Sequence, residues 1–396
     1  MKGIVTPGLV FLVASYILSQ FYRAFLAVLA PQLRADIGAT PEDLSFASGL
    51  WFLVFAAMQI PVGEALDRIG PRRTASVLLL FGAAGGATLF AFATTPAHVT
   101  IAMALIGIGC SPVLMASYYI FARSHAPALF ATLAGITLGI GTLGNLASAL
   151  PLTLLVEAIG WRATMGGLAV VTGLVALAIF ALVTDPPRVR TGARGSVLTL
   201  LAMPVLWPIL AMMAVNYVPA AAIRGLWIGP YLADVFAAPP ALIGAITLVM
   251  GLAMVAGNFI YGPLDRVIAR RKLIILPGNL LGVAALVALV VFAGSGPYVS
   301  ALMLALVGIT GASFVVIIAH AKDFFPDHLT GRGVTLLNLF GMGGAGIFQA
   351  VSGRVWAAAG EVTGDPVATY QVLFGFFAAA LAFGCVAYAF SRENRG

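Results

Sequence analysis

The sequence predicts an all-α membrane protein whose twelve transmembrane helices form two pseudo-symmetric six-helix bundles. Of its 396 residues, 61% are hydrophobic and only 9% are charged, and the mean hydropathy is +1.05. A soluble chain of this size could not bury so much apolar surface. A spanning helix needs roughly 20 apolar residues, so with its loops the chain is long enough for about twelve spans.

The apolar runs predict the position of each span. We expect spans at about 8–31, 42–63, 74–94, 98–121, 131–156, 162–184, 204–230, 241–262, 273–294, 298–320, 332–356 and 368–390. Segment 185–203 is the longest hydrophilic break and leaves six spans on either side. The predicted domains are an N-terminal bundle over residues 1–184, a cytoplasmic linker over 185–203 and a C-terminal bundle over 204–396.

The distribution of positive charge predicts the orientation. Most of the 21 Lys and Arg residues fall in the loops that share one side with both termini and the linker. Loops rich in Lys and Arg stay in the cytoplasm, so we expect a multi-pass protein of the cytoplasmic (inner) membrane with both termini cytoplasmic. The net charge of +7 therefore reflects topology, and we expect a lipid bilayer around the chain and no nucleic-acid partner.

The two halves are related in sequence. A shift of about 199 residues aligns Gln59 with Asn258 and Gly63 with Gly262, and one residue of slip aligns Asp67 with Asp265. Parallel repeats of this kind are typical of transporters built from two six-helix bundles around a central site.

The loop after the second span carries a family resemblance. "GEALDRIGPRR" (Gly63–Arg73) resembles the signature loop of the major facilitator superfamily, and "GPLDRVIARRK" (Gly262–Lys272) resembles its second copy, one residue shorter. The resemblance implies alternating access, with Asp67 near the start of span 11 and Arg332. The gating residues that it implies are Gly63, Asp67, Arg68, Gly70, Arg72, Asp265 and Arg266.

Two arginines lie inside predicted spans. Arg23 precedes Pro31 by eight residues and Arg224 precedes Pro230 by six, which places them about 12 Å and about 9 Å from the helix ends. The 14 acidic residues all fall in loops or at span ends, so an incoming anion could supply the counter-charge. This pair resembles the helix 1 and helix 7 arginines of the organophosphate:phosphate antiporters within the same superfamily.

Other polar side chains could line the same site. Tyr16 and Gln20 share a helix face with Arg23, and Tyr217 shares one with Arg224. The remaining candidates are Gln59, Tyr118, Asn145, Asn258 and Gln349. Each could instead make an interhelical hydrogen bond. Trp51 and Trp227 are either lid residues or part of an interfacial aromatic belt.

The predicted function is secondary active transport of a small organic anion, a carboxylate or a phosphate ester. Three alternatives remain. The first is a proton-coupled exporter of drugs or metabolites, which usually needs an acidic residue inside the membrane, whereas the acidic residues here fall in loops or at span ends. The glycine-rich stretch Leu138–Ser148 resembles a signature of nitrate/nitrite transporters, but Gln59 and Asn258 stand where that family has arginines. The third is a non-transporting assembly factor of the same fold.

The sequence contains no nucleotide-binding loop, catalytic triad or metal-ligand motif. We therefore expect no enzymatic activity, no cofactor and no metal site. The expected partner is the small anionic substrate, coupled to H⁺ or to a counter-anion, and we expect a monomer.

Overall fold

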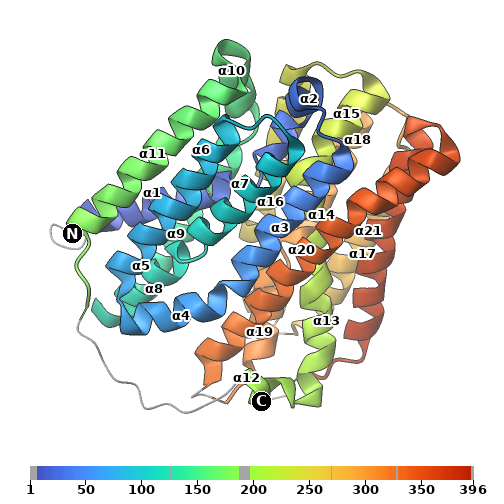
Figure 1. Ribbon diagram of the computed structural model, residues 1–396. Helices are drawn as coiled ribbons and strands as arrows, with labels where there is room; N and C mark the ends of the chain where they lie inside the picture. Colours follow the sequence, from blue (N-terminus) through green and yellow to red (C-terminus); the bar gives the residue numbers. More distant parts are fainter. Residues whose placement is uncertain (1–6, 125–126, 187–196, 269, 327–328, 394–396) are drawn as a thin grey trace. The chain divides into compact units, whose positions relative to one another are not determined.

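The computed structural model describes residues 7–124, 127–186, 197–268, 270–326 and 329–393. Within them the regular structure is helical throughout (Figure 1). The contacts divide the chain into two units, Met1–Thr191 and Gly192–Gly396.

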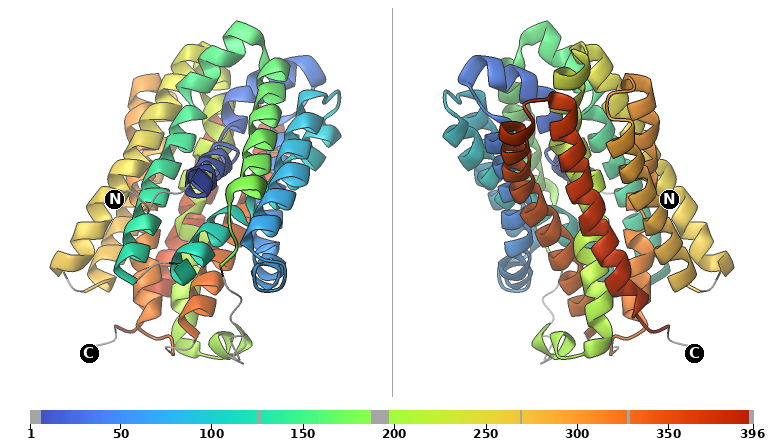
Figure 2. Two further views of the ribbon diagram at one scale, coloured as in Figure 1. Left: turned by 90° about the vertical axis from the view of Figure 1, so that its left-hand side faces the viewer. Right: turned by 90° about the vertical axis from the view of Figure 1, so that its right-hand side faces the viewer.

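The first unit contains the helices of the first six spans. They are α1 (Pro7–Phe21), α2 (Leu26–Ile37), α3 (Pro41–Ala57), α4 (Gln59–Arg68), α5 (Pro71–Leu78), the π-helical η1 (Leu79–Ala84), α6 (Gly85–Ala91), α7 (Pro96–Cys110), α8 (Val113–Ser124), α9 (Pro127–Ala147), α10 (Leu150–Ile159) and α11 (Trp161–Leu182). Proline opens several of them at a position where its missing N–H costs nothing. In Figure 2 the green α11 lies beside the blue helices of residues 71–91, and the contacts agree.

The second unit contains the other six spans. Its helices are α12 (Val197–Leu201), the 3₁₀-helical η2 (Pro204–Leu206), α13 (Trp207–Asn216), α14 (Val218–Ala222), the π-helical η3 (Ile223–Trp227), α15 (Ile228–Phe236), α16 (Pro240–Ile268), α17 (Lys272–Val291), α18 (Pro297–Gly311), α19 (Phe314–Lys322), α20 (Thr330–Thr363) and α21 (Pro366–Ala389). Helix α21 packs along α17 and α13 (Figure 2).

The number of apolar helices confirms the predicted fold class. In the described part of the chain, nine helical segments are long and apolar enough to cross a membrane, and twelve result if each bent pair counts as one span. The bent pairs are α1 with α2 (53°), α3 with α4 (41°) and residues 133–147 with α10 (44°). The bend in the first pair matters most here, because Arg23 lies within it.

The glycine-rich stretches have a packing role in each unit. A Cβ atom on Gly144 would collide with the backbone of Ile17, and one on Gly344 would collide with the backbone of Ala214. Gly144 thus lets α9 pack closely against α1, and Gly344 lets α20 pack closely against α13. Small residues often have this role between helices in membranes. The repeat seen in the sequence therefore recurs in the packing. Close packing alone accounts for Gly144, which lies in the stretch Leu138–Ser148 that resembles the nitrate/nitrite signature.

The predicted orientation can be tested by labelling. In a variant without Cys110 and Cys385, a cysteine at Ser196, which lies outside the described residues, should resist a membrane-impermeant maleimide in intact cells. A cysteine at Ser295, in the turn between α17 and α18, should react and serves as the control. Labelling at Ser196 with protection at Ser295 would reverse the orientation.

Candidate functional site

The break in the first span places Arg23 beside two aromatic rings. Residues 22–25 form a turn between α1 and α2, and Arg23 lies in this turn. Its guanidinium carbon is 5.4 Å from the ring centroid of Trp51 and 5.4 Å from that of Phe55, both on α3. The two rings are stacked on each other, 5.1 Å apart. Cation–π attraction of about 0.5–2 kcal/mol therefore helps to hold the charged group within the apolar helices.

Two hydrogen-bond donors at this point have no acceptor. Within the described residues, the Nε atom of Arg23 and the Nε1 atom of Trp51 are both buried without a hydrogen-bond partner. The Trp51 side chain is 1% exposed. A buried donor left unsatisfied costs about 1–3 kcal/mol. The site therefore presents a permanent cation and two N–H donors next to two aromatic rings. It fits an anionic ligand that is rich in hydrogen-bond acceptors and has an apolar portion.

The neighbouring polar side chains differ in how many of their polar atoms have hydrogen-bond partners. Gln20 donates from Nε2 to the Tyr16 hydroxyl at 3.1 Å, and both residues are buried on α1. The Gln20 Oε1 atom has no donor in the described structure. Gln59 donates to the Phe55 carbonyl at 3.1 Å, so its amide supports the bend between α3 and α4. Tyr118 on α8 and Asn145 on α9 are half-buried.

In the second unit Arg224 lies in the π-helical turn η3 and is 2% exposed. In the same turn, the Trp227 indole donates to the Ser352 hydroxyl at 2.8 Å, and Ser352 donates to the carbonyl of Gln349 at 2.6 Å. Trp227 and Trp51 are both buried within their units, as a lid or core residue would be and a belt residue would not.

Tyr217 lies between α13 and α14, with its ring 6.0 Å from that of Phe314. Asn258 is exposed on the surface of the second unit, on α16, and in this it differs from the buried Gln349. Arg23 and Arg224 belong to different units, so their joint use of one ligand stays a prediction.

The signature loop of the first unit forms a network of its own. Asp67 is 3.7 Å from Arg123 at the end of α8, and Arg68 pairs with Glu64 at 2.7 Å. Gly70 has φ +102°, a conformation that favours glycine, and a Cβ there would meet the Asp185 carboxylate. The backbone N–H of Arg72 donates to that carboxylate at 2.8 Å. Asp185 thus caps the start of α5, where an anion is favoured.

The second copy of the loop is arranged similarly. The N–H of Lys272 at the start of α17 donates to Glu393 at 3.0 Å, which repeats the carboxylate cap of α5. Arg271 binds Asp265 at 3.0 Å and also forms an ion pair with Asp323. The side chain of Arg266 lies outside the described residues. A contact of Asp67 with the start of span 11 remains a prediction, and its partner within its own unit is Arg123.

Sequence reasoning missed two features. It named Trp51 without giving it a ligand role, because helical spacing relates Arg23 only to residues on its own helix. It also did not bring together Asn216, Asn279 and Ser313, which come from three segments and form one buried hydrogen-bonded cluster. Among the residues that the structure describes, no group of three His, Cys, Asp or Glu could hold a metal ion.

Two bundles of membrane-spanning helices, whose first spans each carry an arginine, define a polytopic membrane protein of the transporter type. The family model of the major facilitator superfamily matches residues 12–229 and 220–396, and the chain belongs to that superfamily.

Solved transporters share the fold. A bacterial homolog of the human lysosomal transporter Spinster matches with a TM-score of 0.74 at 17% identity, over 97% of this chain and 95% of that one. The D-xylose-proton symporter matches with a TM-score of 0.79 at 13% identity, over 98% of both chains. At these identities the likeness shows the fold alone.

A curated relative comes from Cupriavidus necator and bears the name "Probable sulfoacetate transporter SauU". It is 28% identical over 148 residues, which are 37% of this chain and 34% of that protein. The match therefore spans about a third of the relative's length.

Proposed function

We infer that this protein carries a small organic anion across a membrane by alternating access, with Arg23 as the counter-charge for the anion. The observation that supports this best is the pair of buried donors, Arg23 Nε and Trp51 Nε1, without an acceptor in the described structure. A guanidinium suits a carboxylate, sulfonate or phosphate because it can donate two parallel hydrogen bonds.

The relative named for sulfoacetate supports an anionic substrate of small size. Sulfoacetate bears a carboxylate and a sulfonate on one carbon, so it could engage a cation at each end. In this proposal Arg23 and Arg224 each take one end, and Tyr16, Gln20, Tyr118, Asn145, Tyr217 and Gln349 complete the lining.

Uptake into proteoliposomes tests the proposal directly. Labelled sulfoacetate and a panel of short carboxylates and phosphate esters should compete for one saturable pathway in vesicles that contain the protein. Uncharged sugars and nucleosides serve as controls and should not compete. Transport of a neutral solute with no effect of any anion would contradict the proposal.

The indole donor gives a sharper prediction. Trp51→Phe keeps an aromatic ring beside Arg23 but removes the N–H, so the anion should lose one hydrogen bond of about 0.5–1.5 kcal/mol. We expect anion affinity to fall about two- to tenfold with melting temperature nearly unchanged, measured by calorimetry and thermal unfolding. Trp207→Phe is the control, because the Trp207 indole is at the surface and bonds only to the Leu201 carbonyl. Equal affinity in both variants would remove Trp51 from the site.

A further inference from the structure

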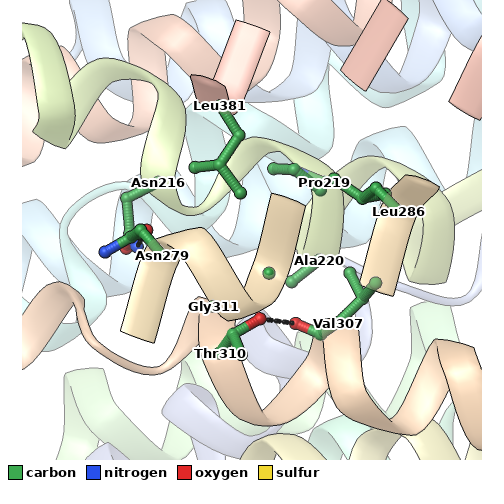
Figure 3. Close-up of a pocket in the computed structure, with 10 residues that line it drawn as sticks. Asn216, Pro219, Ala220, Asn279, Leu286, Val307, Thr310, Gly311 and Leu381 are labelled. Carbon is green, nitrogen blue, oxygen red and sulfur yellow. Dashed lines mark hydrogen bonds between the residues drawn. The ribbon is translucent and has the colours of Figure 1, made fainter. Parts of the chain in front are cut away.

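Helix α19 has a buried polar cluster at each end. At its start, Ser313 accepts hydrogen bonds from Asn216 and Asn279, which lie together in Figure 3. Near its end, His320 is 1% exposed and bonds both to α21 and to the segment that follows α21. The amides and hydroxyl of the first cluster do not titrate near neutral pH, whereas a histidine does. His320 is not among the residues proposed to bind the anion.

The hydrogen bonds of His320 fix where the proton lies on its ring. The Nε2 atom is 3.0 Å from the carbonyl oxygen of Arg392, which can only accept, so Nε2 carries the proton. The Nδ1 atom therefore accepts the hydroxyl of Tyr388 at 2.7 Å. Both partners suit a neutral ring. A second proton on Nδ1 would meet the hydroxyl proton of Tyr388, so this hydroxyl has to turn away before His320 can become charged.

The packing around the ring also opposes a charge on it. The ring lies edge-on to the rings of Tyr388 and Phe324, with centroids 5.7 Å and 5.6 Å away. Tyr388 is itself fully buried. An imidazolium at this place would lose its hydration and gain little in return, because aromatic rings replace the water.

The charged groups of the neighbouring elements have other partners. Arg271 binds the carboxylates of both Asp265 and Asp323. Glu393 accepts the backbone N–H of Lys272 at 3.0 Å. In the described structure neither ring nitrogen of His320 bonds to a carboxylate. The charged residues of the elements that pack around the ring are Asp265 on α16, Arg271 and Lys272 at the start of α17, Lys322 and Asp323 at the end of α19, and Arg392 and Glu393 after α21.

His320 also helps to hold residues 389–393, which we call the C-terminal strap. The Lys272 ammonium donates to the carbonyls of Ala389 and Ser391 at 2.6 Å and 2.8 Å. Together with the bonds of His320 to the Arg392 carbonyl and of Glu393 to the start of α17, these contacts tie the strap to two helices. Of the side chains that hold it, only His320 titrates in the neutral range.

We propose that His320 makes the C-terminal strap sensitive to pH, so that proton uptake by the ring releases the strap from α19. The bound strap keeps the ring neutral and buried, whereas a released strap exposes it to water, where it can carry a charge. The released form therefore binds the proton more tightly, and acid shifts the equilibrium toward release. Release frees the ends of α17, α19 and α21 from one another, so the pH on this side of the membrane regulates movement in the second unit.

Hydrogen exchange of the purified full chain, with no solute to transport, tests this switch. The backbone amides of the strap are compared at about pH 7.5 and about pH 5.5, which bracket the ordinary range of histidine, after correction for the intrinsic exchange rate. We expect protection of the strap to fall about threefold or more at the lower pH, since one proton changes an equilibrium by up to about tenfold per pH unit.

His320→Gln retains an N–H donor for the Arg392 carbonyl but cannot take up a proton, so its strap should be equally protected at both pH values. His98→Gln is the matched control, because His98 lies in the first unit and bonds only to Thr94, and it should behave like the parent protein. Tyr388→Phe removes the hydroxyl bonded to the neutral ring, so release should begin at a higher pH.

Two results would overturn the switch. One is equal protection of the parent strap at both pH values. The other is a fall in protection that persists in His320→Gln, which would assign the pH dependence to the carboxylates instead. If His320→Gln does not fold, Tyr388→Phe decides, and release at the same pH as in the parent protein would remove His320 from this role.

Discussion

Arg23→Lys is expected to weaken anion binding by roughly 10- to 150-fold while the fold is kept, because charged hydrogen bonds contribute about 1.5–3 kcal/mol. Lysine preserves the charge but cannot form the paired hydrogen bonds of a guanidinium. Arg23→Gln should bind still more weakly and melt at an equal or higher temperature, since it removes a half-buried charge that has no acidic partner in the described structure. Calorimetry and thermal unfolding on the same purified variants measure both effects.

Arg162→Lys is the control for this series. Arg162 pairs with Asp36 at 3.1 Å, is about half exposed and takes no part in the proposed site. Its replacement should leave anion affinity unchanged. A structural role for Arg23 gives the opposite pattern, with a lower melting temperature for Arg23→Gln and unchanged anion affinity in the folded fraction.

Asp67→Asn is expected to lower the transport rate about tenfold or more while the dissociation constant of the anion changes less than about twofold. Asp67 is exposed, 3.7 Å from Arg123, and belongs to the signature loop rather than to the aromatic site around Arg23. A gating residue acts on the equilibrium between conformations, and that equilibrium sets the rate more than it sets affinity. Initial uptake rates and calorimetric affinities measured on one preparation separate the two effects.

Glu64→Gln is the matched control on the same helix, because Glu64 is also exposed and pairs only with Arg68 one turn away. Exposed pairs of this kind contribute about 0.3–0.5 kcal/mol, so the transport rate should stay within about twofold of the parent. A large loss of affinity at full rate in Asp67→Asn would instead place Asp67 in the binding site.

Most of the fold could be predicted from the sequence, because the spans and the internal repeat can both be recognised in the order of residues along the chain. The runs of apolar residues located the spans, and the shift between the copies of the Asp-Arg loop indicated two related halves. The bend at residues 22–25 left no such signal, since neither proline nor glycine lies there. It follows from tertiary packing, and sequence periodicity treats the span as one straight helix.

The candidate site was predictable only in part, for a related reason. A permanent cation within a run of apolar residues is evident from the sequence alone, so Arg23 and Arg224 could be identified as candidates. The partners of Arg23 lie on another helix, and no spacing rule relates Trp51 or Phe55 to it. The Asn216 cluster was hidden for the same reason. Its three side chains look like ordinary interhelical polar groups until their hydrogen bonds show that they form one cluster.

A thermal-unfolding screen of the purified chain with short organic anions tests whether Arg23 is the counter-charge of a transported anion. An anion present at 100 times its dissociation constant should stabilise the folded state by about 2.7 kcal/mol, and sulfoacetate is the first to try. We expect one or more anions to raise the melting temperature of the parent protein, and Arg23→Gln and Arg224→Gln to lose most of that shift. An intact shift in both variants, or none with any anion in the parent, would contradict the account of Arg23 as the counter-charge of a transported anion.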